Sequence, residues 1–438
     1  MAILSKDEAQ TILRKVLSFS KADECEANLS GTIGGNIRYA RNSVSTSGAE
    51  ENTSLAVEAR FGKRAGVATI NEFDDASLRK VVQRAEETAR IAPENPEYIE
   101  FLGPQTYLPT NAHFASTANI KPEYRAEVAG KSIELANAKN LTAAGFLEDY
   151  SNFNAKMNSK GLFAYNQDSS IEFSVTMRTA DGTGSGYATR DFSDVNKFDA
   201  AEASQVAIAK ALGSTNAKAI EPGKYTVILE PAAAVTLMQN MFSSFDTRNA
   251  DEGRSFLAKK GGGTKLNEKL FDDRVTIYSD PSNPDIPQGA WAGDGRPLEK
   301  ITWVDKGVVK NMYNTRFWAQ KQNIKSIPRP SGFIITGGTQ SIDDMIKSTE
   351  RGVLVTRLWY IRAVDPQTLL YTGLTRDGTF YVENGKIKHP VKNFRFNESP
   401  VIMLNNLEAL GKPQRVEGNL VPPMKIRDFT FTSLSDAV

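Results

Sequence analysis

The chain has 438 residues, of which 40% are hydrophobic and 24% are charged. This balance excludes disordered and fibrous proteins, and the length predicts two or three domains. Lysine and arginine number 53 against 52 aspartates and glutamates, so no overall charge favours binding to nucleic acid or to an anionic membrane.

The single cysteine, Cys25, excludes a disulfide within the chain and favours a reducing compartment. A reactive thiol is one interpretation, but Cys25 alternates with Ala27 and Leu29 as a small buried strand residue would. Residues 1–20 hold no apolar stretch of signal-peptide length, and no run approaches the roughly 20 apolar residues that cross a bilayer. We therefore expect a soluble, cytoplasmic protein without membrane contact.

The first section, residues 1–92, is predicted to be an α+β domain. Apolar residues at helical spacing predict a helix at 9–17, and alternation predicts strands at 55–61 and 67–73 on either side of a turn at 62–66. Asp74 or Asp75 is expected to cap a second helix, which ends before Pro93. Five prolines between residues 93 and 122 indicate an extended connection.

The middle section, residues 123–222, is predicted to pack with the first. We expect helices at 123–139 and 200–212, the second capped by Asp199, around a block rich in strands. Phe173, Val175 and Met177 alternate with polar residues, which predicts an antiparallel sheet with one wet face. The glycine-rich residues 181–186 do not have the G-x-G-x-x-G spacing of a dinucleotide site, so they indicate a hairpin loop.

The last section, residues 223–438, is predicted to be β-rich. It opens with a strand at 225–229 and a helix at 232–245. Asn384 and Gly385 indicate a hairpin, and a late helix is expected at 400–410. Because strands and helices cluster and do not alternate, the fold class is α+β: an N-terminal mixed part with an antiparallel sheet and flanking helices, then a β-rich C-terminal domain.

Histidine is scarce in this chain. His113 and His389 are the only two, neither belongs to a spaced pair, and zinc sites need three or four histidine, cysteine or carboxylate ligands. We interpret both as surface or turn residues. No G-x-S-x-G elbow favours a serine hydrolase, while a catalytic carboxylate pair stays open because 52 acidic residues single out no pair.

Several segments of the second half resemble the TldD/PmbA family. They include residues 289–297 with 303–309, the run 352–356, the run from Asp365 through Gly378, and residues 381–387. Residues 60–68 of the N-terminal section fit as well. The resemblance covers most of the chain in the family's order, and it implies the fold of a peptidase family whose members were once named modulators of DNA gyrase.

The resemblance implies one of two branches. TldD-type members carry H-E-x-x-x-H on the helix that opens the C-terminal domain, with a cysteine ligand near the C-terminus, and cut small unfolded peptides with zinc. TldE-type members, also called PmbA, lack these ligands and pair with TldD. Laid on that motif, Met238 and Ser243 replace the two histidines and Gln239 replaces the glutamate, and residues 411–427 hold no cysteine. The resemblance thus implies a TldE/PmbA-type chain with no cofactor, no metal site and no catalytic residue of its own.

Three functions follow as hypotheses. The first is a non-catalytic subunit that pairs with an HExxxH-containing, TldD-like chain to degrade or process small unfolded peptides, with a homodimer possible when that partner is absent. Thr375 and Arg376 are our candidate peptide contacts, against a simple turn at Arg376–Gly378. The second is a metal-independent hydrolase using carboxylates or Ser243, and the third is a regulatory binding protein that modulates gyrase.

Overall fold

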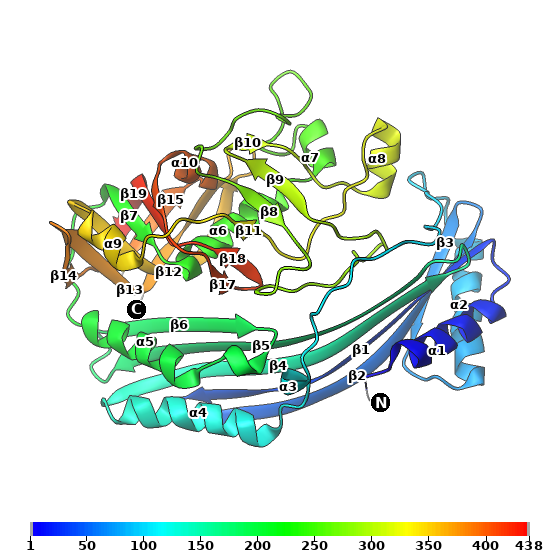
Figure 1. Cartoon of the computed structure of the whole chain (residues 1–438), viewed down its shortest axis with the longest axis horizontal. Helices are drawn as coiled ribbons and strands as arrows, with labels where there is room; N and C mark the ends of the chain where they lie inside the picture. The colour runs from blue at the N-terminus through cyan, green and yellow to red at the C-terminus, as the bar shows by residue number, and fades with distance from the viewer. Residues whose placement is uncertain (1–2, 436–438) are drawn as a thin grey trace.

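A computed structural model describes residues 3–435. Its N-terminal part is one six-stranded antiparallel sheet in the order β3-β2-β1-β4-β5-β6 (Figure 1). The strands are β1 (Glu24–Ala40), β2 (Ser43–Phe61), β3 (Arg64–Ile70), β4 (Leu141–Asn158), β5 (Phe163–Thr179) and β6 (Ser185–Phe192). The chain leaves this sheet after β3 and returns at β4, which pairs with β1 along almost its full length.

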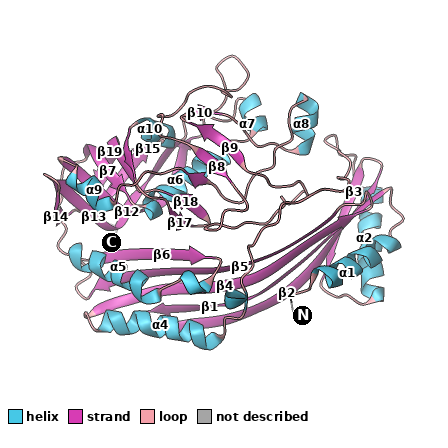
Figure 2. Cartoon of the chain, viewed as in Figure 1, coloured by secondary structure: helices cyan, strands magenta, loops and turns pink. Residues whose placement is uncertain are grey.

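Helices cover one face of this long sheet. At one end lie α1 (Lys6–Phe19) and α2 (Asp75–Ile91), and at the other lie α4 (Pro122–Asn137) and α5 (Ala200–Gly213), as Figure 2 shows. Alternate strand residues, such as Leu147 and Phe173, are buried under these helices. The intervening residues point to the other face of the sheet, which the alternation of β5 predicts to be wet. The C-terminal domain lies on the side of this second face.

The helix starts follow the predicted caps. The Asp74 side chain accepts hydrogen bonds from the amides of Ala76 and Ser77, and Asp199 accepts from the amides of Ala201 and Glu202. Such caps supply partners for amides that have none inside the helix. Between α2 and α4 runs the predicted proline-rich connection, which forms only the short α3 (Ala115–Ala118).

The C-terminal part holds two further sheets. One has the order β10-β9-β8-β11-β18-β17 and the other β12-β7-β19-β15-β13-β14, with β16 beside β19. Their bounds are β7 (Gly223–Leu229), β8 (Ile277–Ser279), β9 (Ile301–Asp305), β10 (Val308–Val309), β11 (Ile334–Ile335), β12 (Arg351–Asp365), β13 (Leu370–Glu383), β14 (Lys386–Pro390), β15 (Phe394–Glu398), β16 (Leu407–Leu410), β17 (Gln414–Val416), β18 (Asn419–Val421) and β19 (Met424–Leu434). The helices are α6 (Pro231–Ser243), α7 (Thr247–Asp251), α8 (Arg316–Gln322), α9 (Ile342–Lys347) and α10 (Pro400–Asn405).

The α+β fold class is confirmed, and so are the hairpins at residues 180–184 and at Asn384–Gly385. The helix predicted at 400–410 is wrong in its second half. After Asn405 the chain forms β16, which pairs with β19. Leu407–Leu410 have good helix propensity, but pairing with a strand some 15 residues later decides their state.

Among residues 3–435, no helix is long and apolar enough to cross a membrane.

Candidate functional site

Helix α6 lies at the centre of the C-terminal domain and presents one narrow polar stripe. The helix begins at Pro231, after Glu230, which follows β7, and proline is favoured at this first position of a helix. The apolar residues of α6 fill the core of the domain. Four residues in the second half of α6 stay partly or fully accessible and lie about one helical turn apart: Thr236, Gln239, Asn240 and Ser243. This stripe is the part of α6 that can meet a ligand.

The three residues aligned with the HExxxH motif differ in burial and in their contacts. Met238 is fully buried in the core cluster, as its helical spacing with Val235, Phe242 and Phe245 predicts. Ser243 is exposed, and its hydroxyl donates to the carbonyl of Gln239 at 2.8 Å. Gln239 lies near enough to Glu417 to lower the pKa of that carboxyl against the effect of burial. Only Gln239 therefore faces other polar side chains of the site.

Across from α6, the wet face of the N-terminal sheet carries a row of carboxylates. Glu148 of β4 pairs directly with Glu172 of β5, and Glu172 pairs directly with Asp191 of β6. Directly opposed residues of an antiparallel sheet place their side chains about 5 Å apart on one face, and like charges there are destabilising. Three neighbouring strands thus hold an arrangement that costs stability.

The C-terminal domain adds a fourth carboxylate to this row. Glu417 lies in the tight turn between β17 and β18, where it and Gly418 both have positive φ (48° and 70°). The same turn ties the two domains together, because Arg415 Nε donates to Asp191 Oδ2 at 2.8 Å and the Gly418 amide donates to the same oxygen at 3.0 Å. Asp191 is therefore neutralised, whereas Glu172 and Glu417 have no ion pair of this kind among the described contacts.

The pKa values of these carboxyl groups reflect their surroundings. Burial raises the pKa of Glu172, and the charges of Asp191, Glu148 and Glu417 raise it further. Burial also raises the pKa of Glu417 against the hydrogen bond from Gln239, and that of Asp168 against hydrogen bonding from Asn152. Glu172 and Glu417 are nevertheless both exposed to solvent, which screens part of this effect.

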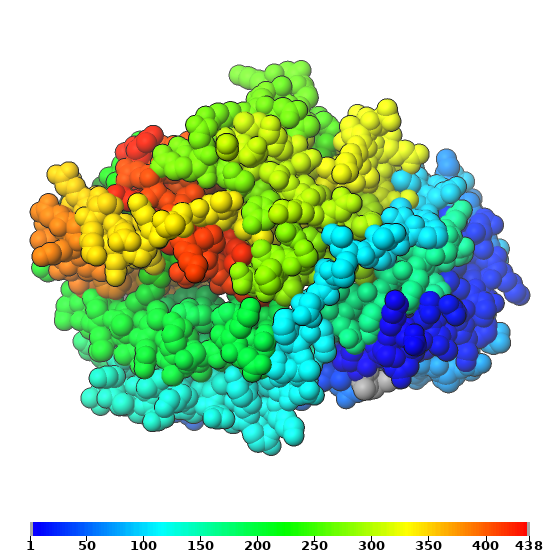
Figure 3. Space-filling model, viewed as in Figure 1, coloured from blue at the N-terminus to red at the C-terminus, as the bar shows by residue number. Residues whose placement is uncertain are grey.

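These residues line two adjoining cavities between the domains, of about 350 and 420 Å³. Glu172 and Glu417 belong to both. Figure 3 shows the surface hollowed where the orange-red residues around β17 meet the green residues of β6. We call this space the interdomain cleft.

Thr375 and Arg376 lie on β13, beside a third cavity of about 310 Å³ that is separate from the cleft. The Thr375 side chain is buried, and its hydroxyl accepts from the Phe394 amide at 2.9 Å. Arg376 is partly exposed, 3.8 Å from Asp377 Oδ2 and stacked over the ring of Trp359. Neither lines the interdomain cleft, so a peptide contact by these two residues remains a prediction.

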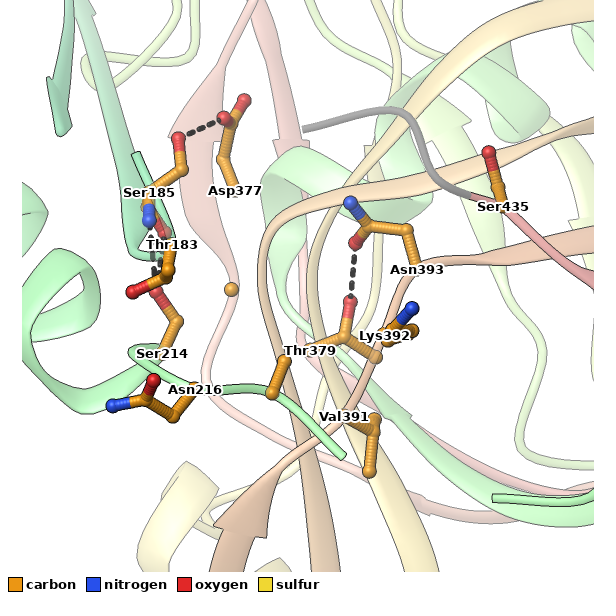
Figure 4. Close-up of a pocket in the computed structure, with 12 residues that line it drawn as sticks. Thr183, Ser185, Ser214, Asn216, Asp377, Thr379, Val391, Lys392, Asn393 and Ser435 are labelled. Atoms are coloured by element: carbon orange, nitrogen blue, oxygen red, sulfur yellow. Dashed lines mark hydrogen bonds between the residues drawn. The ribbon is translucent and has the colours of Figure 1, made fainter. Parts of the chain in front are cut away.

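Asp377 lines this third cavity and joins the two domains there. Its carboxylate accepts from the Ser185 hydroxyl at 2.6 Å, as Figure 4 shows, and from Arg357 at 3.1 Å. Arg357 in turn stacks over Tyr187 of β6. This contact and the Arg415–Asp191 pair hold β6 against the C-terminal domain.

The remaining candidates lie elsewhere. His113 lies near Asp168, and His389 of β14 stacks on Tyr381 of β13 with ring centroids 5.3 Å apart. Cys25 is buried in β1, as its alternation predicts, and burial raises the pKa of its thiol to about 11. Among residues 3–435, no group of three or more histidine, cysteine and carboxylate side chains is placed to hold a metal ion.

Sequence reasoning missed Glu148, Glu172, Asp191 and Glu417 as one site. The alternation of β5 already placed Glu172 on a wet face, so part of the signal was present. The register that opposes it to Glu148 and Asp191, and the turn that brings Glu417, are tertiary facts.

Comparison with known proteins supports the fold and the domain order. Residues 222–433 match the PmbA/TldA metallopeptidase C-terminal domain, and residues 25–89 match the PmbA/TldA metallopeptidase domain 1. Together the two matches cover more than half of the chain.

Curated relatives are distant in sequence. The metalloprotease PmbA of Escherichia coli O157:H7 is 21% identical over 97% of this chain and 98% of its own length. A metalloprotease of Methanothermobacter thermautotrophicus is 21% identical over 61% of this chain, and the match spans 62% of that relative. A metalloprotease of Archaeoglobus fulgidus is 24% identical over 44% of this chain and 47% of its own length.

Solved structures share the whole fold. TldE from Thermococcus kodakarensis aligns over 97% of this chain and 99% of its own, with a TM-score of 0.88 at 18% identity. A candidate modulator of a DNA gyrase from Thermotoga maritima aligns over 97% of this chain and 100% of its own, with a TM-score of 0.88 at 16% identity.

Proposed function

Because this chain belongs to the TldD/PmbA family, we propose that it is a TldE/PmbA-type subunit that contributes no catalytic metal to a TldD/TldE-type metallopeptidase complex acting on small unfolded peptides. An HExxxH-bearing partner supplies zinc and the general base in this proposal. The present chain supplies the second wall of the peptide site.

The state of α6 carries this proposal. Zinc peptidases need nitrogen, sulfur or carboxylate ligands and a carboxylate that takes a proton from the metal-bound water. At the three motif positions, the Met238 thioether is sealed in the core, the Ser243 hydroxyl bonds to the helix backbone, and the Gln239 amide cannot accept that proton. These residues do not fit a zinc ion, so no catalytic step is assigned to them.

The metal-independent hydrolase is less well supported. Ser243 is exposed, but the hydrogen bonds described for its hydroxyl go to the Gln239 and Asn240 carbonyls, which are not bases that activate a nucleophile. The carboxylates of the interdomain cleft remain the best groups for such a reaction. Gyrase modulation stays a third hypothesis.

Reconstitution tests the proposal. The purified chain, an HExxxH-bearing partner and their mixture are assayed with an unfolded peptide, with and without a chelator. We expect cleavage by the mixture, loss of cleavage with chelator, and none by this chain alone. A partner whose motif glutamate is changed to glutamine serves as the matched control. Chelator-resistant cleavage by this chain alone would show that the proposal is wrong.

A further inference from the structure

The interdomain cleft has a ligand chemistry that the proposed function leaves undefined. Five carboxylates line its two cavities, from Glu148, Asp168, Glu172, Asp191 and Glu417, and they face a single lining arginine, Arg415. Arg415 is occupied by Asp191 at 2.8 Å. Arg357 lies over Tyr187 at the edge of the cleft and acts on Glu417, but it is paired with Asp377 at 3.1 Å. The cleft therefore carries more negative than positive charge, although the whole chain is nearly neutral.

An independent feature of the same cleft points to a ligand. Gln288 lines the cavity of about 350 Å³ with Glu172 and Glu417, and the residue is only 8% exposed. Neither its amide nitrogen nor its amide oxygen has a hydrogen-bond partner. A buried polar group without a partner costs stability, and Gln288 is the residue with both side-chain polar atoms unpartnered among those described in residues 3–435. The amide offers one donor face and one acceptor, which complement the C=O and N–H of a peptide unit.

Repulsion within the carboxylate row points the same way. Glu148, Glu172 and Asp191 are directly paired across three strands, and both Glu172 and Glu417 have a raised pKa. A positive ligand group would relieve this repulsion, whereas a negative one would increase it. Gln239 of α6 lies near Glu417, although no α6 residue lines the two cavities.

We propose that the interdomain cleft binds an extended peptide segment bearing an amine or guanidinium group, with Glu172 and Glu417 as the partners of the cation and Gln288 as the partner of the peptide backbone. This deepens the proposed function, on which it rests, by giving it a substrate class: cationic unfolded peptides. Glu172 and Glu417 select charge, and Gln288 holds any peptide regardless of charge.

Binding of three peptides tests this assignment. Short fluorescent glycine- and serine-rich peptides, identical except for lysine, glutamine or glutamate at the same positions, are titrated against the full chain by fluorescence anisotropy. The measurement is repeated with the partner complex. We expect the lysine peptide to bind about tenfold or more tightly than the glutamate peptide, and we expect added salt to reduce this ratio.

Four variants separate the two roles. Glu172→Gln and Glu417→Gln should each reduce the lysine-over-glutamate ratio about threefold to tenfold. Gln288→Leu should weaken all three peptides to a similar extent and leave the ratio unchanged. Glu94→Gln removes an exposed loop carboxylate beyond α2 and should change nothing. Tryptophan fluorescence and circular dichroism check that each variant is folded.

Each outcome decides the matter. Equal affinities for the three peptides, no binding by either the chain or the complex, or a ratio insensitive to Glu172→Gln and Glu417→Gln would overturn this assignment. If the chain stimulates a partner's cleavage equally for lysine and glutamate peptides, the cleft assignment fails while the proposed function holds. If the lysine preference is found but no partner is stimulated, the proposed function fails while the cleft assignment holds.

Discussion

Replacing Met238 with alanine tests whether this position belongs to the core or to a ligand site. The side chain is fully buried within the cluster that also contains Val235, Phe242 and Phe245. The substitution removes everything beyond the β-carbon and leaves a cavity in a packed interior. Methionine-to-alanine changes at such sites cost about 2–5 kcal/mol, and we expect about 3 kcal/mol in the free energy of unfolding.

Urea denaturation followed by tryptophan fluorescence is a suitable assay. All four tryptophans lie in the C-terminal domain, and Trp303 packs edge-on against Phe242 with ring centroids 5.3 Å apart. The signal therefore reports the domain that contains α6. The matched control is Ser243→Ala on the exposed side of the same helix, which should change stability by about 0.5 kcal/mol or less.

A cost for Met238→Ala as small as that of Ser243→Ala would refute our reasoning. It would mean that Met238 lies outside the core and that another register of α6 faces the cleft. The lack of metal ligands at position 238 would then need another explanation.

Three further predictions concern charge and burial. Because the pKa of Glu172 is raised in the folded protein, its ionised form destabilises the fold at neutral pH. Glu172→Gln should therefore raise the thermal unfolding midpoint at pH 7, and this gain should shrink as the pH falls towards 4.5. An equal gain at both pH values would contradict the prediction. Arg415→Ala leaves Asp191 without its cation between the domains and should lower the free energy of unfolding in urea by about 2–3 kcal/mol. Arg274→Ala, which breaks an exposed pair with Asp272, should lower it by about 0.5 kcal/mol or less. Equal losses would show that the pair between the domains contributes no more than an exposed pair. The Cys25 thiol, buried and with a pKa of about 11, should react with a disulfide reagent at pH 8 only after unfolding in denaturant, and rapid labelling of the native protein would reveal an accessible thiol.

Much of the scaffold follows from local patterns in the sequence. Asp199 caps the helix that it was expected to cap, and of the two candidates Asp74 and Asp75 it is Asp74 that caps α2, because an N-cap is a contact within a few residues. The alternation of Phe173, Val175 and Met177 gives both the strand and its buried face. The helix predicted at 400–410 fails after Asn405 because β19, a distant strand, competes for Leu407–Leu410.

The candidate site divides in the same way. Residue identity alone determines that α6 offers no histidine, and helical spacing determines that Met238 is core. The sequence cannot show that Glu172 would be set between Glu148 and Asp191, because strand register is fixed by pairing along the whole sheet.

By itself, the sequence determined the fold class, the caps and the lack of metal donors on α6, since each depends on residue type or on neighbours within one or two turns. Only the tertiary structure decided that Glu417, on a hairpin turn of the C-terminal domain, would lie beside the carboxylate row of the N-terminal sheet. The same cavity contains Gln288, whose side-chain amide has no hydrogen-bond partner. The reason is physical: sheet register aligns Glu148, Glu172 and Asp191 across three strands, and the Arg415–Asp191 contact between the domains joins residues 224 positions apart.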